Sequence, residues 1–180
     1  MNKKSDGLHS ENSTGTTGEA ALKNILGERW HQCSGDLGDG KIDYNNKEYY
    51  YELKSSTKKF SETIKLNQIR AIKCIPVIIY SQTDNKWALV SPQDIMSAAS
   101  KKKRGQHSEL FIENCGLSNK NFDLKIIESN ELISELEKMF ILVETDTVKK
   151  LIKKSEEIKE RLQKLNESLK KEIEEVLNGS

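Results

Sequence analysis

The chain has 180 residues and a mass of 20.5 kDa, which suits one compact domain with an appendage and excludes two large domains. Apolar residues form 35% of the chain and charged residues 32%, so part of the chain is expected to lack a core of its own. No apolar run is long enough to span a membrane, and the net charge of +1 neither proposes nor excludes a polyanionic partner. We therefore expect a soluble, cytoplasmic protein with no membrane partner.

The N-terminal quarter is predicted to contain an arm, a helix and a short strand. Residues 1–14 are polar without periodicity, which is typical of a flexible arm. Apolar residues then recur at helical spacing up to Gly27, which is expected to end the helix. Residues 28–33 suit a short strand, and a glycine-rich turn with Asp36, Asp39 and Asp43 follows.

The clearest local signal is a β-hairpin. Residues 41–44 and 47–55 read as two strands, and the intervening Asn45 and Asn46 tolerate the positive φ that a tight turn requires. The second strand is rich in tyrosine and strongly strand-prone.

The middle of the chain alternates between further short elements. The expected elements are a helix over Ser61–Lys73, buried and paired strands over Ile75–Tyr80 and Trp87–Val90, a helix over Pro92–Ala99, a basic loop over Lys101–His107, and extended pieces over Leu110–Ile112 and Leu124–Ile127.

The C-terminal segment carries a heptad pattern from about Asp146 onward. The a and d positions are Val148, Leu151, Ser155, Ile158, Leu162, Leu165, Leu169 and Val176, with Glu172 at one d position. Such a helix would span on the order of 50 Å, too long to pack wholly on so small a domain. The heptad pattern therefore predicts a coiled-coil-type helix and a homodimer. The alternative is that the helix folds back on its own domain. The expected division is 1–14, 15–143 and 144–180.

Three charged residues in and next to the hairpin suggest a catalytic site. Glu52 and Lys54 are two residues apart on one strand, so both side chains point to the same face. Continuing the register of the turn sets Asp39 opposite Glu52. Asp43 is the alternative first carboxylate, but its pairing with Glu52 needs a turn with poorer turn residues.

Converging carboxylates repel unless a cation lies between them, and hard oxygen ligands suit Mg²⁺, with Mn²⁺ as a substitute. Such an ion lowers the pKa of a bound water, and the ammonium of Lys54 would stabilise charge on a phosphoryl group. This combination predicts phosphodiester hydrolysis. The alternatives are that Glu52 and Lys54 form a solvated salt bridge, and that the aspartates only form turns.

The segments 38–43 and 51–55 resemble the PD-(D/E)xK nuclease superfamily, and most closely small type II restriction endonucleases. The resemblance implies an α/β fold with a restriction-endonuclease-like mixed central sheet flanked by helices. It also implies that Asp39 and Glu52 are metal ligands together with the Leu53 carbonyl, and that Lys54 orients or activates water. The resemblance points more weakly to two further site residues, which are Glu19 of the first helix and Gln68 on a helix after the strand that carries Lys54.

Residues 54–104 contain eleven basic and three acidic residues, which favours contact with a polyanion. The basic residues and their polar neighbours expected to contact DNA phosphates or base edges are Lys58, Lys59, Lys101, Lys102, Lys103, Arg104, Gln106 and His107. The alternative is a solvated basic surface.

Together these features predict a Mg²⁺-dependent, site-specific type II restriction endonuclease that hydrolyses phosphodiester bonds in double-stranded DNA as a homodimer. The catalytic set is Asp39, Glu52 and Lys54. The alternatives are a structure-specific repair or recombination nuclease, and a non-catalytic DNA-binding module on a nuclease-like fold.

Overall fold

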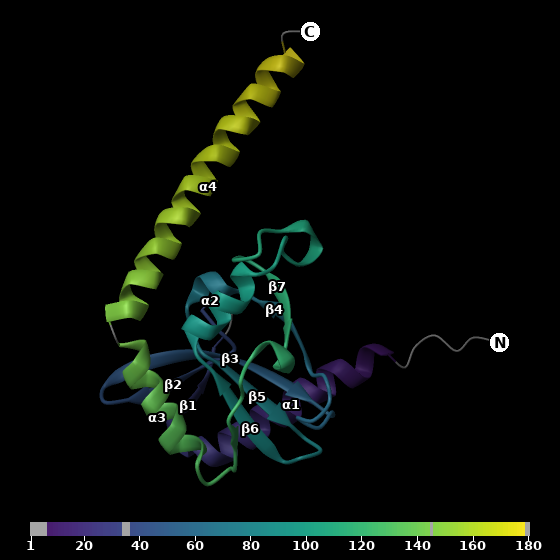
Figure 1. The fold of residues 1–180 in the computed structure, drawn as a ribbon, viewed down its shortest axis with the longest axis vertical. Coiled ribbons are helices and arrows are strands. Elements are labelled where there is room, and N and C mark those ends of the chain that lie inside the picture. The colour runs from purple at the N-terminus through teal and green to yellow at the C-terminus, as the bar shows by residue number, and fades with distance from the viewer. Residues whose placement is uncertain (1–6, 34–36, 145, 179–180) are drawn as a thin grey trace, which may run out of the picture.

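The computed structural model describes residues 7–33, 37–144 and 146–178, and its fold is α/β (Figure 1). A mixed six-stranded sheet has the order β1-β2-β3-β5-β6-β8, and β4 pairs with β7 in a separate two-stranded sheet. The bounds of the helices and strands are α1 Gly7–Leu26, β1 Trp30–Gln32, β2 Gly40–Tyr44, β3 Lys47–Ser56, β4 Lys65–Ile69, β5 Val77–Ser81, β6 Lys86–Val90, α2 Pro92–Ser100, β7 Cys115–Ser118, β8 Ile126–Ile127, α3 Leu132–Val143 and α4 Asp146–Asn178.

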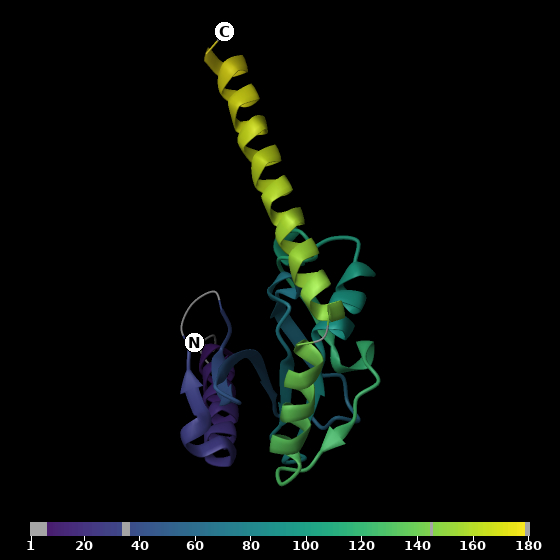
Figure 2. The same cartoon turned by 90° about the vertical axis from the view of Figure 1, so that its left-hand side faces the viewer.

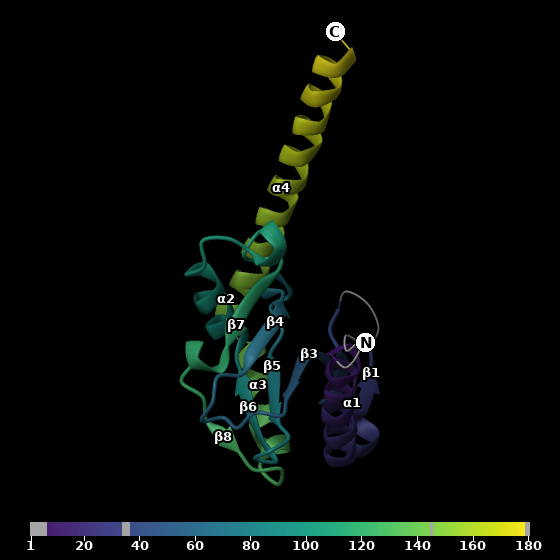
Figure 3. The ribbon, with the colours of Figure 1, turned by 90° about the vertical axis from the view of Figure 1, so that its right-hand side faces the viewer.

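Strand β3 joins the two parts of the large sheet, because it changes its partner along its length. Its first half pairs antiparallel with β2, from Tyr44 opposite Lys47 to Gly40 opposite Tyr51. Its second half pairs in parallel with β5, beginning at Glu52 opposite Val77. Figure 3 shows β3 between the layer of α1 and β1 and the layer that contains β5 and β6.

Two hydrophobic clusters cover the two faces of β5. Ile78 and Tyr80 pack with residues of α1 and α3, whereas Val77 and Ile79 pack with residues of α2, β4 and β7. Burial on both faces explains why β5 is a continuous apolar run rather than an alternating one. The expected mixed sheet flanked by helices is thus confirmed.

The predicted hairpin is confirmed in its turn and register. Asn45 and Asn46 have φ values of 50° and 59°, the left-handed conformation that a two-residue hairpin turn needs. The predicted helix Pro92–Ala99 is also confirmed as α2, where the Ser91 side chain accepts a hydrogen bond from the Asp94 N–H. The predicted end of the first helix is correct as well, since α1 stops at Leu26 and Gly27 has a φ of 58°.

The predicted helix Ser61–Lys73 is wrong: this segment forms β4 and a short 3₁₀ helix, η2 (Ala71–Lys73). The register of β4 with β7 shifts between Leu66 and Ile69, where Gln68 has a φ of 57°. A bulge inserts one extra residue into a strand. The buried Leu66 and Ile69 are therefore three residues apart, a spacing that also occurs on one face of a helix. Gln68 therefore does not lie on a helix.

Three smaller expectations also differ. Helix α1 begins at Gly7, within the predicted flexible arm, because extending an existing helix costs less than starting one. Residues 1–6 lie outside the described part. Leu110–Ile112 form a turn rather than an extended piece, in a loop closed by a hydrogen bond from the Gln106 N–H to the Asn114 carbonyl. Helix α3 was not expected.

Helix α4 begins at Asp146 as predicted and projects from the domain (Figures 1 and 2). Its first part packs on the domain, where Ser155 is buried and donates a hydrogen bond to the Ile72 carbonyl at 3.4 Å. Residues 163–178 are exposed. Only the first part of the helix therefore folds back. No helix in the described ranges combines the length and apolar content that crossing a membrane requires.

The buried side chain of Asn119 supports the chain around Phe60–Ile64. Its amide donates to the carbonyls of Phe60 and Glu62 at 3.0 and 2.8 Å and accepts from the Ile64 N–H at 2.9 Å. We expect N119A to lower the free energy of unfolding by about 3 kcal/mol, because these backbone groups lose their partner. Urea unfolding followed by circular dichroism measures this. N130A, in an exposed turn, should change it by less than about 0.5 kcal/mol; equal losses would contradict the assignment.

Candidate functional site

The site begins with two charged residues on β3. Glu52 and Lys54 lie opposite Val77 and Ile79 of β5, on the face of the sheet that α2 covers. Their side chains are only 12% and 21% exposed, and Lys54 Nζ lies 2.7 Å from Glu52 Oε1. Alternation along the strand places the intervening Leu53 side chain in the core on the opposite face. This anchors the strand while both charged groups share one surface.

A second lysine faces the same carboxylate. Lys73, in η2, has its Nζ 3.9 Å from Glu52 Oε2, and its side chain is 14% exposed. Each oxygen of Glu52 therefore faces one lysine. The sequence by itself shows Lys73 only as one of the eleven basic residues of segment 54–104. The predicted helix over 61–73 is wrong, so it gave no indication that Lys73 of η2 lies beside Glu52.

Asp39 reaches β3 from the end of β2. Its N–H donates to the Tyr51 carbonyl at 3.0 Å, and its Oδ2 accepts the Leu53 N–H at 2.8 Å. Asp39 thus lies one step beyond the last pair of the hairpin, Gly40 opposite Tyr51. The structure brings the Asp39 carboxylate to the residue that follows Glu52.

The close approach of this segment to β3 depends on Gly38. A Cβ atom at this position would lie 2.6 Å from the Tyr51 carbonyl oxygen, a backbone atom that cannot move alone. A larger residue would therefore push Asp39 away from the Leu53 N–H.

Asp43, the alternative first carboxylate, lies elsewhere. It pairs with Glu48, and four residues of β3, about 13 Å, separate Glu48 from Glu52. Its side chain is half exposed and lies 2.8 Å from His31 Nε2. The geometry therefore favours Asp39 as the partner of Glu52. Asp36 lies outside the described residues.

Helix α1 packs closely against β3 at Gly18, where a Cβ atom would lie 1.8 Å from Ser55 Oγ. The neighbouring Glu19 is half-buried. Burial raises the pKa of the Tyr51 hydroxyl, and the charges of Asp39 and Glu19 raise it further. Glu19 and Asp39 thus both lie near the same tyrosine.

The basic residues form two groups. Lys58 and Lys59 are exposed just after β3, where the Lys58 carbonyl accepts a hydrogen bond from Ser81. The second group is the loop after α2, in which the exposed side chains are Lys101, Lys103, Arg104 and His107, and Lys102 is half-buried.

Gln106 has a structural contact, because its Oε1 accepts the Gln68 N–H at 2.8 Å at the bulge of β4. This bond ties the basic loop to β4, whose end leads into η2 and Lys73. The amide oxygen of Gln106 is thus already engaged by protein.

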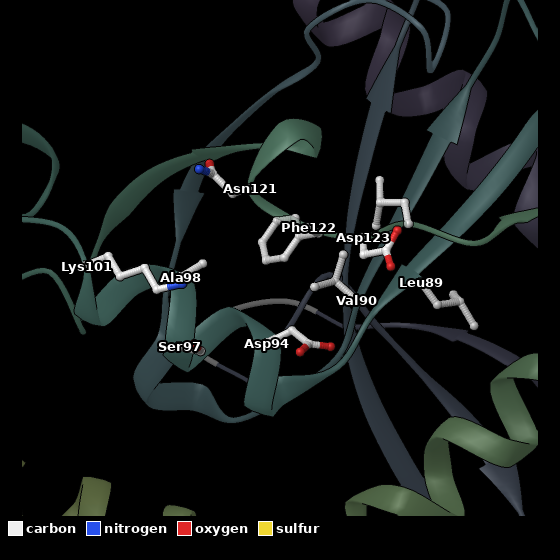
Figure 4. Close-up of a pocket in the computed structure, with 10 residues that line it drawn as sticks. Leu89, Val90, Asp94, Ser97, Ala98, Lys101, Asn121, Phe122 and Asp123 are labelled. Carbon is white, nitrogen blue, oxygen red and sulfur yellow. The ribbon is translucent and has the colours of Figure 1, made fainter.

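A separate pocket of about 210 Å³ lies between α2 and the segment 121–124 (Figure 4). Phe122, Asp94, Asp123 and Lys101 are among its lining residues, and neither Asp39 nor Glu52 lines it. Two carboxylates share this pocket with Lys101 and weaken its attraction for a phosphate. Lys103 and Arg104 are therefore the better candidates for phosphate contact.

The donor set suits a hard divalent cation. Asp39 and Glu52 supply two carboxylates, and the resemblance adds the Leu53 carbonyl. Mg²⁺ keeps several waters and needs only one or two carboxylates, which this small set provides. Within the ranges that the structure describes, no group of three or more His, Cys, Asp or Glu side chains is arranged to hold a metal ion. The donors of Asp39 and Glu52 are oxygen atoms, which Mg²⁺ and Mn²⁺ prefer, whereas zinc sites are typically built from His and Cys.

Comparison with protein-family models, with curated proteins and with solved structures finds no match to this chain.

The role of Gly38 is testable by stability. We expect G38A to lower the free energy of unfolding by about 1–3 kcal/mol, because the added methyl group overlaps the Tyr51 carbonyl. G116A in β7 is a matched control, since its Cβ would lie no closer than 4.0 Å to Asn67. It should lower stability by less than about 0.5 kcal/mol. Urea unfolding compares the two, and an unchanged midpoint for G38A would contradict the close approach.

Proposed function

We propose that the protein is a Mg²⁺-dependent endonuclease that hydrolyses phosphodiester bonds in double-stranded DNA. One observation carries the proposal: the Asp39 carboxylate binds the N–H of Leu53, directly after Glu52, while Lys54 and Lys73 face the two oxygens of Glu52. Asp39 thus binds the backbone of the residue next to Glu52, at the place where β3 changes its partner, and two lysines face Glu52 there. This is the charge set that metal-assisted phosphoryl chemistry needs.

Asp39 and Glu52 would hold the metal, with the Leu53 carbonyl as a further oxygen donor. When bound, Mg²⁺ supplies positive charge that stabilises the negative charge developing on the attacked phosphate. Mn²⁺ has similar ligand preferences and is the expected substitute. The hydrogen bond from the Leu53 N–H fixes the orientation of Asp39 before any ligand binds.

The two lysines would act on the phosphate and the water. An ammonium group next to the scissile phosphate stabilises the charge that builds as the water oxygen bonds to phosphorus. The bond between phosphorus and the leaving oxygen then breaks, the attacking water gives up one proton, and the leaving oxygen takes up one, so that the net transfer is from the water to the leaving group. Lys54 is the first candidate because the motif contains it, and Lys73 supplies a second cation on the other side of Glu52.

DNA would be positioned by exposed basic side chains. Lys58 and Lys59 lie just after the end of β3, and Lys103 and Arg104 lie on the loop that Gln106 ties to β4. Contacts of this kind bind phosphates without reading sequence and weaken as salt rises. We expect the protein to be cytoplasmic and its substrate to be double-stranded DNA.

A restriction-endonuclease-like fold and site-specific cleavage belong to the same proposal. The order of the hairpin, the parallel strand β5 and α2 around Glu52 supports the fold. Discrete fragments from unbranched plasmid would favour a restriction enzyme, whereas cleavage confined to branched DNA would favour a repair or recombination nuclease.

The proposed roles of Asp39 and Glu52 are tested by DNA cleavage. Wild-type protein is incubated with unmethylated plasmid or phage DNA in Mg²⁺ or EDTA and the products are separated on a gel. We expect cleavage only with Mg²⁺, and a loss of at least about a hundredfold for E52A and for D39N, because each removes a carboxylate of the site. D43N is the matched control and should cleave at the wild-type rate.

Binding measured in EDTA separates catalysis from association. E52A should bind DNA as well as wild type does. Wild-type protein that binds DNA in EDTA and never cuts with Mg²⁺ would instead identify a non-catalytic binding module.

Lys73 is tested separately as a second cation of the site. We expect K73M to lower the cleavage rate roughly ten- to a hundredfold at unchanged DNA affinity, because one positive charge leaves the neighbourhood of the phosphate. K73R should recover most of the rate, which a purely structural role would not explain. K65M, at an exposed lysine of β4, is the control and should retain full activity. An unchanged rate for K73M would remove Lys73 from the site.

A further inference from the structure

Helix α4 consists of two parts that differ in their surroundings. Up to Leu162 the helix has side chains in contact with the domain: Ser155 is 4% exposed, and Ile158 and Leu162 are half-buried. From Gln163 to Asn178 every residue is exposed, and Figures 1 and 2 show this part of the helix projecting from the sheet. The second part thus has no residue buried against its own domain.

The projecting part nevertheless carries an apolar stripe. Leu165, Leu169 and Ile173 follow one another at four-residue spacing and are 65%, 53% and 50% exposed. They continue the line of Ile158 and Leu162 along one side of the helix. A short helix is marginal in water on its own, and an exposed apolar stripe of this kind marks an interaction surface.

Charges beside the stripe identify the occupant. Arg161 and Glu175 lie fourteen residues apart, about four turns, and therefore on the same edge of the stripe, with Ser168 midway between them. The edge is thus basic at its start and acidic at its end. When two such helices run antiparallel about Ser168, Arg161 of each copy lies beside the partner's Glu175.

A parallel pair would be penalised on this same edge. Glu172 lies eleven residues, about three turns, after Arg161 and occupies a d position of the heptad. In a parallel pair it would face the partner's Glu172 across the seam, and two like charges in contact are destabilising. The antiparallel arrangement separates them.

A groove beside α4 fits the same register. Leu110, Glu113, Lys159 and Leu162 are among the residues that line it, and Leu110 is 41% exposed. In a pair centred on Ser168, the partner's Leu177 comes level with Lys159. The end of the partner helix therefore reaches the groove, where Leu110 and Leu162 would cover an apolar side chain that is 71% exposed in the single chain.

We propose that the protein forms a homodimer through an antiparallel pairing of the projecting parts of α4, with the end of each helix in the groove between α4 and Leu110 of the other copy. The two Ser155 residues would be about 40 Å apart along the helix pair, so the two domains lie at opposite ends and do not collide. The interface is isologous, because each contact occurs twice by symmetry. The proposal does not depend on the nuclease function.

The first test is the molar mass of the full chain by light scattering and sedimentation equilibrium. We expect about twice 20.5 kDa for wild type. L165K should be a monomer, whereas I141K is the matched control, because Ile141 on α3 is similarly exposed at 60% and should leave the dimer intact. Tryptophan fluorescence reports on Trp87, which is fully buried, and checks that both variants keep the folded domain.

The second test determines the direction of the helices. R161E places like charges beside the partner's Glu175 and should raise the dimer dissociation constant about tenfold. The double variant R161E/E175R restores both ion pairs in an antiparallel dimer and should return the constant to near the wild-type value.

A monomeric wild type, or a dimer that L165K leaves intact, would overturn the proposal. A dimer that R161E weakens and the double variant does not restore would refute the antiparallel arrangement. A wild-type monomer that cuts DNA would refute the dimer proposal alone, and a wild-type dimer that never cuts DNA would refute the proposed function alone.

Discussion

The fold and the candidate site both depend on the change of partner within β3. A strand has one hydrogen-bonding edge on each side, and β3 uses one edge for β2 up to Tyr51 and the other for β5 from Glu52 onward. Where β2 has just ended, the next N–H of β3 on that edge, that of Leu53, needs an acceptor. The Asp39 carboxylate provides it. The end of the ladder therefore places a carboxylate next to Glu52 for a structural reason, and the chemistry proposed for the site uses that placement.

The Glu52 carboxylate on β3 has a positively charged neighbour at each of its oxygens. Glu52 is only 12% exposed and faces two lysines, so the partly buried carboxylate has positive neighbours on both of its oxygens. Partly buried charges need such partners, because desolvation penalises an isolated one. The balance stabilises the site as it stands. It also leaves two cations close to any phosphate that Asp39 and Glu52 would approach through a metal ion.

The start of α4 is connected to the site through η2. Ser155 of α4 donates its hydroxyl to the Ile72 carbonyl, and Lys73 is the next residue. Cys74 packs against the same serine, and its burial raises the pKa of its thiol. The helix that projects from the domain is thus anchored on the turn that presents Lys73 to Glu52. Pairing of the projecting parts would constrain this turn in each copy.

The sequence by itself determined the features that depend on neighbours in the chain. Asn45 and Asn46 fixed the turn, the two-residue period put Glu52 and Lys54 on one face, Ser91 capped α2, and the heptads predicted α4. Only the tertiary structure decided the rest. It placed Asp39 rather than Asp43 beside Glu52, brought Lys73 to the same carboxylate across twenty-one residues, and turned the segment 61–73 into a strand with a bulge. The physical reason is that these contacts join residues far apart in the chain, so their geometry is set by packing between elements, which local spacing does not encode.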